Sequence, residues 1–304
     1  MSIRPAISTS NAMPTLEGAG VHLHRAFGFR DPTAHDPFLL LDDFRNDEPA
    51  AYQAGFPWHP HRGIETITYI LSGSVDHADS LGNTGSLGAG DIQWMTAGSG
   101  ILHQEMPKGN ALGRMHGFQL WANLPGSLKM TAPRYQDVES KEMPVVIDDD
   151  GTSVKIITGE FWGKRGPVDG IAADPLYLDI SVPAGLRKKF KVDTYRNAFA
   201  YVFAGAGKFT DASAPQGILL EKEILGEELN IRDLSGNRTL VQFGTGDEIE
   251  VQAGPEGMRF LLIAGAPIQE PVAWHGPIVM NTQQELQQAF DDLRNDRFIR
   301  PIEH

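Results

Sequence analysis

Residues 58–71, WHPHRGIETITYIL, combine a metal-binding pattern with a β-strand. Side chains two positions apart in a strand point to the same face, so His59 and His61 are expected to project together, followed by Glu65 if no bulge intervenes. The run from Glu65 to Leu71 is rich in β-branched and aromatic residues and ends at a Ser-Gly-Ser turn, which is typical of a strand. The stretch therefore predicts a β protein with metal ligands on its strands.

Further short strand patterns lie on both sides of this stretch, each closed by Gly, Pro, Asn or Ser. No long helical period interrupts them, which indicates an antiparallel sandwich or barrel. The patterns occupy residues 20–29, 36–44, 75–80, 85–98, 101–106, 115–125, 153–161, 176–185, 187–192, 197–209, 239–254 and 258–268.

The strand patterns form two similar sets. Residues 69–75, YILSGSV, resemble residues 201–207, YVFAGAG, and LGAGDIQWMTAG at 87–98 resembles FGTGDEIEVQAG at 243–254. The polar, Pro- and Gly-rich segment 125–150 lies between the sets. We therefore predict a duplicated fold, with one domain at 1–135 and a second at 136–304.

The end of the chain carries a helix pattern. Thr282 can cap a helix, and Glu285 three residues later completes a capping box. Leu286, Phe290 and Leu293 then fall on one face at helical spacing. We expect a C-terminal amphipathic helix packed on one of the sheets.

A second ligand pair follows the first at a suitable distance along the chain. In ILHQEM, residues 101–106, His103 and Glu105 have the same i, i+2 relation as His59 and His61. A first-row metal held by imidazoles and a carboxylate needs three or four converging ligands, and facing strands could supply them. The two pairs together favour a metal site over isolated polar residues.

Other histidines test this interpretation. His22 and His24 also form a His-x-His pair, but no partner at matching spacing lies nearby, so an edge or surface strand is expected there. His116 is close to the site in sequence and need not point inward. The strands after residue 150 that correspond to the ligand-bearing ones contain no histidine, so no equivalent metal site is expected in the second half.

Composition narrows the classes of function. The 304 residues have a formal net charge of −13 and no basic run, which disfavours direct nucleic-acid and anionic-membrane binding. No cysteine is present, and neither a signal-peptide core nor an apolar run of bilayer length occurs. A cytoplasmic location is expected.

Four segments together resemble the pirin family of the cupin superfamily, over nearly the whole chain. They are residues 59–83, 90–107, 117–125 and 270–286. The resemblance implies a bicupin: two antiparallel jelly-roll-like barrels packed face to face. It also implies one mononuclear metal ion held by His59, His61, His103 and Glu105. The ion expected is Fe²⁺, with another divalent first-row metal as the alternative. Glu65 is then a polar group of the strand or an outer-shell residue.

The resemblance further implies two functions, since similar proteins are described as quercetin 2,3-dioxygenases and as transcriptional coregulators. In the first, a flavonol and O₂ are the substrates, carbon monoxide is released, and Glu105 is the candidate catalytic base. In the second, a metal-responsive protein acts through a protein partner. A metal-dependent isomerase or decarboxylase is the third class, because a fold does not decide function.

Overall fold

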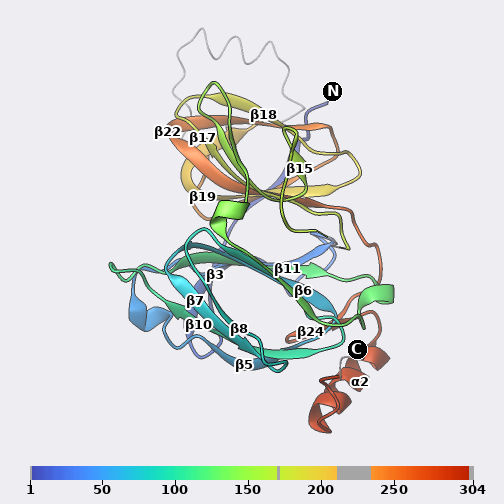
Figure 1. The fold of residues 1–304 in the computed structure, drawn as a ribbon. Helices are drawn as coiled ribbons and strands as arrows, with labels where there is room; N and C mark the ends of the chain where they lie inside the picture. Colours follow the sequence, from blue (N-terminus) through green and yellow to red (C-terminus); the bar gives the residue numbers. More distant parts are fainter. Residues whose placement is uncertain (1, 170–171, 211–233, 301–304) are drawn as a thin grey trace. The chain divides into compact units, whose positions relative to one another are not determined.

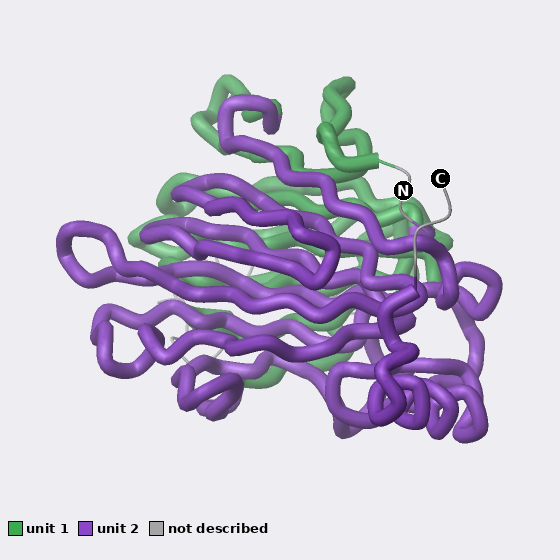
Figure 2. Tube along the Cα trace, turned by 60° about the horizontal axis from the view of Figure 1, so that its bottom comes forward, with its two compact units in different colours: residues 1–12, 144–169, 174–267 green, residues 13–143, 170–173, 268–304 purple. Residues whose placement is uncertain are grey.

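The computed structural model describes residues 2–169, 172–210 and 234–300. They form two compact units, coloured separately in Figure 2. Unit 1 comprises Met1–Ala12, Pro144–Asp169 and Asp174–Pro267, and unit 2 comprises Met13–Met143, Gly170–Ala173 and Ile268–His304. Each unit is built on antiparallel sheets.

Unit 2 contains two larger sheets and a hairpin, and its sheets form facing layers in Figure 1. The seven-stranded sheet has the order β12 (Arg134–Val138), β9 (Ile92–Thr96), β6 (Ile64–Ser72), β11 (His116–Asn123), β4 (Phe38–Asp43), β3 (Val21–Phe27) and β2 (Met13–Glu17). The four-stranded sheet has the order β5 (Phe56–His61), β10 (Ile101–Lys108), β7 (Ser74–Asp79) and β8 (Thr84–Leu87). The hairpin pairs β23 (Ala273–His275) with β24 (Ile278–Met280), and short 3₁₀ turns lie at Pro49–Ala51, Gly126–Leu128 and Ser140–Glu142.

Unit 1 is built on one nine-stranded sheet. Its main path is β1 (Ala6–Asn11), β21 (Thr239–Phe243), β19 (Asn197–Phe209), β22 (Glu248–Gly265), β17 (Leu176–Val182), β14 (Ser153–Thr158) and β13 (Val145–Ile147). β18 (Arg187–Lys191) pairs with β22, β20 (Ser235–Gly236) pairs with β19, and β15 (Glu160–Phe161) forms a hairpin with β16 (Lys164–Arg165). Alternate side chains of these strands, such as Leu178, Ile180 and Phe260, fill one apolar core.

The all-β architecture and the C-terminal helix predicted from sequence are confirmed. The compact units, however, do not follow one another along the chain: residues 1–12 belong to unit 1, and residues 268–300 with the helix belong to unit 2. The physical reason is pairing between segments that are distant in sequence: β1 pairs with β21, and Arg62 forms an isolated β-bridge with Ile278. As a division into independently folding domains, the boundary at residue 135 stays a prediction.

Helix α2 (Gln283–Arg294) begins as expected. Thr282 Oγ1 accepts a hydrogen bond from the Glu285 N–H at 3.1 Å, and Glu285 Oε2 accepts one from the Thr282 N–H at 2.9 Å. Leu286 is buried, and Phe290 and Leu293 pack beside it on an apolar cluster with Ile278 and Met280 of β24. The capping box and the apolar face are both confirmed. Among the described residues, no helix is long and apolar enough to cross a bilayer.

Loss of the cap should have a modest, measurable cost. We expect Thr282→Ala to lower the free energy of unfolding of unit 2 by about 1 kcal/mol, because the Glu285 N–H loses its acceptor. Thr282→Ser keeps the acceptor and should remain near wild type. Thermal melts followed by circular dichroism test this, and equal midpoints for the two variants would contradict it.

Candidate metal centre

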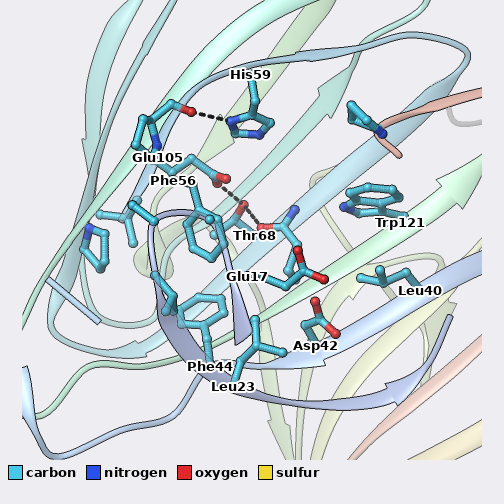
Figure 3. Close-up of a pocket in the computed structure, with 18 of the residues that line it drawn as sticks. Glu17, Leu23, Leu40, Asp42, Phe44, Phe56, His59, Thr68, Glu105 and Trp121 are labelled. Carbon is cyan, nitrogen blue, oxygen red and sulfur yellow. Dashed lines mark hydrogen bonds between the residues drawn. The ribbon is translucent and has the colours of Figure 1, made fainter. Parts of the chain in front are cut away.

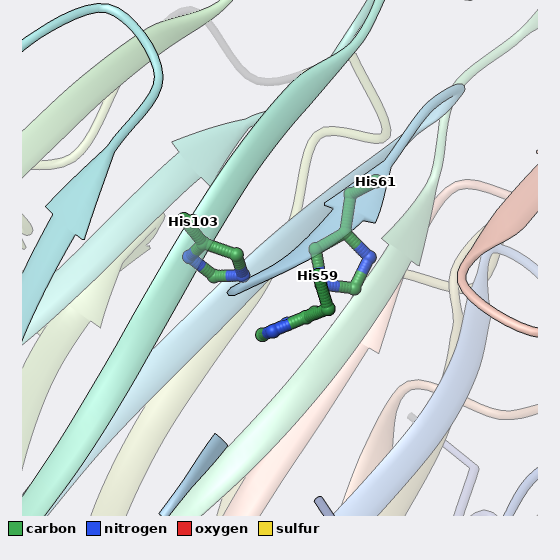
Figure 4. A group of neighbouring side chains, drawn as sticks. All are labelled: His59, His61 and His103. Atoms are coloured by element: carbon green, nitrogen blue, oxygen red, sulfur yellow. The ribbon is translucent and has the colours of Figure 1, made fainter. Parts of the chain in front are cut away.

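Three histidines converge inside unit 2 (Figure 4). His59 and His61 project from β5, and His103 lies opposite His59 on the neighbouring strand β10. One ligand nitrogen from each ring lies within 4.8 Å of the others. The ring centroids are 4.8 Å apart for His59 and His61, 4.4 Å for His59 and His103, and 5.0 Å for His61 and His103. The three histidines therefore lie together, but on paired neighbouring strands of one sheet rather than on the facing strands expected from the sequence, because β5 and β10 are hydrogen-bonded to each other.

Backbone carbonyls set the tautomers of two rings. His59 Nδ1 lies 2.8 Å from the Pro57 oxygen, and His61 Nδ1 lies 3.2 Å from the Pro277 oxygen. A carbonyl only accepts, so each Nδ1 carries the hydrogen and each Nε2 keeps a lone pair. Metal-binding histidines commonly have such outer-shell acceptors. Both rings are therefore prepared to present Nε2 to a metal ion.

His103 shows most directly that the cluster suits a metal. It is buried, and neither ring nitrogen has a hydrogen-bond partner among the described residues. An unpaired buried polar group is costly, and a metal ion would satisfy one of these nitrogens. Burial lowers the pKa of His103 and of His61 well below the ordinary range, and neighbouring histidines act in the same direction. Neutral imidazole is the form that binds metals.

Glu105 lies beside the histidines without joining their close group. A register shift between His103 and Glu105 places Glu105 opposite Phe56 on β5 rather than opposite Pro57. Its Oε1 accepts a hydrogen bond from Thr68 Oγ1 at 3.1 Å, and burial raises the pKa of the carboxyl group, whereas the charge of a protonated His59 would lower it. Its role as fourth ligand stays a prediction.

Glu65 does not share the face of the ligand pair. β5 ends at His61, Gly63 has a φ of +79°, and Glu65 lies on β6 in the other sheet. Its Oε1 accepts a hydrogen bond from Thr96 Oγ1 at 2.7 Å. Because β6 is regular from Glu65 to Thr68, Glu65 points to the face opposite the one that carries Thr68.

The other histidines that the sequence pattern singled out do not belong to this group of three. His116 Nε2 lies 2.7 Å from Asp47 Oδ1, so this ring is engaged away from the cluster. His22 is exposed on β3, and neither it nor His24 belongs to a metal-binding group among the described residues. All of unit 1 lacks histidine.

A cavity of about 480 Å³ adjoins the cluster (Figure 3), within the roughly 300–1,000 Å³ typical of small-molecule sites. His59, His61 and Glu105 contribute to its wall, and Thr68 and Gln119 add polar groups. Most of the remaining surface is apolar and is supplied by side chains including Val21, Leu23, Phe29, Leu40, Phe44, Phe56, Trp58 and Trp121. The Trp121 ring meets His61 edge-on, with centroids 5.1 Å apart. The cavity wall is therefore mostly apolar, with the charged residues Glu17, Arg25 and Asp42 also lining it, and it reaches two of the histidines.

Sequence reasoning missed several of these contributors. The Pro277 carbonyl and the Thr68 hydroxyl act through contacts between distant segments, for which no local spacing exists. Trp121 lies in a stretch whose sequence predicts a strand and contributes to the family resemblance, and neither indicates that its side chain lines a cavity. The i, i+2 alternation along β11 does place Gln119 and Trp121 on one face, which was the available signal.

Two antiparallel β units, with a histidine cluster beside the cavity of one of them, define a protein of cupin type with a candidate metal site. Residues 20–122 match the family model described as Pirin, and residues 177–299 match the Pirin C-terminal cupin domain. The chain belongs to the pirin family.

Relatives and solved structures agree with this assignment. A pirin-like protein of Caulobacter vibrioides is 44% identical over 299 residues, covering 98% of this chain and 100% of the relative. The pirin of Homo sapiens is 40% identical over 281 residues, covering 92% and 88%. The crystal structure of a quercetin 2,3-dioxygenase from Acinetobacter baumannii is 29% identical, with a TM-score of 0.83 and coverage of 98% of this chain and 99% of that one. The family and the bicupin fold predicted from sequence are confirmed.

Proposed function

We propose that this protein holds one divalent first-row metal ion, iron(II) foremost, through His59, His61, His103 and Glu105, and cleaves a flavonol such as quercetin with O₂. The observation that carries the proposal is the group of three converging imidazoles beside an apolar cavity. The similar protein from Acinetobacter baumannii, named as a quercetin 2,3-dioxygenase, supports the reaction class.

The donor set fits the metal. Imidazole nitrogens suit iron, nickel, copper and zinc, and two histidines with one carboxylate are the set of many non-haem iron oxygenases. Three histidines and Glu105 are a close variant of that set. When bound, such an ion supplies Lewis acidity toward a substrate oxygen and a place for O₂.

The chain's own residues would bind and orient the substrate. Phe56 and Trp121 line the cavity and offer flat apolar surface to an aromatic ring system, which also excludes water. A flavonol inserted with its 3-hydroxyl group toward the histidines would bring that group near Glu105. If Glu105 detached from the ion, its free carboxylate oxygen would accept the hydroxyl proton, leaving an electron-rich ring for reaction with O₂.

Activity is tested on iron-loaded protein with quercetin in air. We expect loss of the flavonol absorbance band with matching oxygen uptake and release of carbon monoxide. Glu105→Ala should lower the rate by about 10²–10⁴-fold, the range for removal of a general base. Equal rates for wild type, Glu105→Ala and metal-free protein would mean spontaneous oxidation and would refute the proposal.

Anaerobic assays separate the other classes. A dioxygenase stops without O₂, whereas an isomerase or decarboxylase continues to turn over its substrate. A metal-responsive regulator that acts through a protein partner shows no turnover in either atmosphere. Absence of turnover in both, with the metal bound, would favour the regulator.

A further inference from the structure

Thr68 links the candidate ligand Glu105 to Gln119, and all three side chains line the cavity. Thr68 Oγ1 lies 3.1 Å from Glu105 Oε1 and 3.0 Å from Gln119 Oε1. Thr68 is on β6 and Gln119 is on the neighbouring strand β11, where they pair directly. Gln119 also lines the cavity, so three side chains connect the metal centre to the place where a ligand would lie. In Figure 3 the dashed lines at Thr68 mark these two contacts, and the dashed line at His59 marks its contact with the Pro57 oxygen.

The number of available hydrogens determines which of the three side chains donates to which. A threonine hydroxyl donates one hydrogen bond, and an ionised carboxylate only accepts. When Thr68 donates to Glu105, its contact with Gln119 is a hydrogen bond only if the amide turns its NH₂ group toward Thr68. The two amide orientations differ by a half-turn and have the same shape. Gln119 then donates to Thr68, Thr68 donates to Glu105, and the Gln119 carbonyl oxygen is left for the cavity.

We propose that Thr68 and Gln119 are positioning residues for Glu105, and that the Gln119 carbonyl oxygen accepts a hydrogen bond from a hydroxyl group of the substrate. Thr68 holds one carboxylate oxygen, which leaves the other available to the metal. A polyhydroxylated aromatic ligand is then preferred over an apolar one of the same shape, because it satisfies the amide. This inference rests on the proposed function, since it takes Glu105 as a ligand.

Strand β6 offers a matched control. Thr66 and Thr68 lie two positions apart on the same face of the strand, and each is 2% exposed. The structure shows no hydrogen bond between the Thr66 side chain and Glu105. Thr66→Val and Thr68→Val therefore make the same change of shape and polarity at equal burial, and only the second removes the bond to Glu105.

Cobalt(II) is the probe, because its d–d absorption reports coordination without turnover. We expect Thr68→Val to weaken Co²⁺ binding by about 10–100-fold, the usual effect of removing an outer-shell partner, and to change the absorption. Thr68→Ser should restore both properties, and Thr66→Val should match wild type. Equal dissociation constants and spectra for the two valine variants, measured by chelator competition on folded protein, would overturn the inference.

Gln119 is tested by a pair of variants that differ in charge. Gln119→Glu and Gln119→Leu both remove the amide donor to Thr68, and Gln119→Glu also adds a second carboxylate near Glu105. We expect both variants to change the Co²⁺ absorption relative to wild type, because Thr68 loses the donor that orients its hydroxyl group toward Glu105. We also expect Gln119→Leu to raise KM for quercetin more than it lowers kcat. A Co²⁺ spectrum of Gln119→Leu equal to that of wild type would contradict the role of Gln119 in positioning Glu105.

Glu105→Gln separates this inference from the proposed function. An unchanged Co²⁺ spectrum in Glu105→Gln would show that Glu105 is not a ligand, and the four-ligand site itself would fail. A changed spectrum in Glu105→Gln, together with an unchanged one in Thr68→Val, would refute only the proposal that Thr68 and Gln119 position Glu105.

Discussion

The His103→Ala variant is expected to lose most of its metal and all activity above background. The imidazole is buried without a hydrogen-bond partner among the described residues, as expected for a side chain whose partner is a bound ion. Loss of a direct ligand should weaken metal binding by more than the roughly 10–100-fold seen for outer-shell partners. Elemental analysis of purified protein measures the effect, with about one metal ion per chain expected in wild type and none held by residues beyond 150.

Three companion variants and one control complete this test. His59→Ala, His61→Ala and Glu105→Ala should each lower the metal content. His24→Ala, which alters the other His-x-His pair, should not. Full occupancy in the His103 variant would refute the ligand assignment.

The metal-free His103→Leu protein should unfold near the metal-free wild type, since an unpaired imidazole contributes no hydrogen bond to stability.

Arg62→Ala is expected to destabilise unit 2 by about 3–5 kcal/mol, the usual cost of breaking a buried ion pair by removing one partner. The Arg62 side chain is 2% exposed. It donates to the Ser99 oxygen at 2.7 Å, to Asp292 Oδ2 at 2.9 Å and to the Phe298 oxygen at 3.0 Å. Its guanidinium also lies 4.2 Å from the centre of the Phe298 ring. The substitution would leave a buried carboxylate and two carbonyls without this donor.

The control residue is Arg294, on helix α2, which also carries Asp292. The Arg294 side chain is 65% exposed and pairs with Asp291, so Arg294→Ala should cost less than about 1 kcal/mol. Four of the five tryptophans belong to unit 2, and a Trp162→Phe background makes fluorescence report that unit alone. Urea unfolding of metal-free protein then compares the two arginine variants. Similar losses in both would contradict a structural role for the buried pair.

The same arginine shows why part of the site was not predictable. Arg62 follows His61 directly in WHPHRG, and nothing in that stretch indicates that its partner is Asp292 on α2. The acceptor for His61 Nδ1, the Pro277 carbonyl, is likewise 216 residues away in sequence. A long-range contact depends on how the chain returns to the sheet, and a local pattern does not contain that information.

The position of Glu65 illustrates the opposite error of extending a pattern too far. The i, i+2 rule placed it with His59 and His61 provided that the strand continued. Gly63 interrupts the strand with a positive φ, and an added Cβ there would lie 2.0 Å from the Val279 oxygen. The direction of the Glu65 side chain is therefore set by a turn that fits against another segment, and the turn moves Glu65 into the other sheet.

By itself, the sequence determined the features that depend on near neighbours in the chain. The alternation of side chains along β5 and β10 oriented His59, His61 and His103, and the capping box at Thr282 and Glu285 began the helix, because strand and helix geometry repeats over a few residues. Only the tertiary structure decided that residues 268–300 complete unit 2, that Thr68 reaches Glu105, and that apolar side chains from separate strands enclose a cavity beside the histidines. Those features require segments distant in sequence to pack together, and packing is a property of the whole fold.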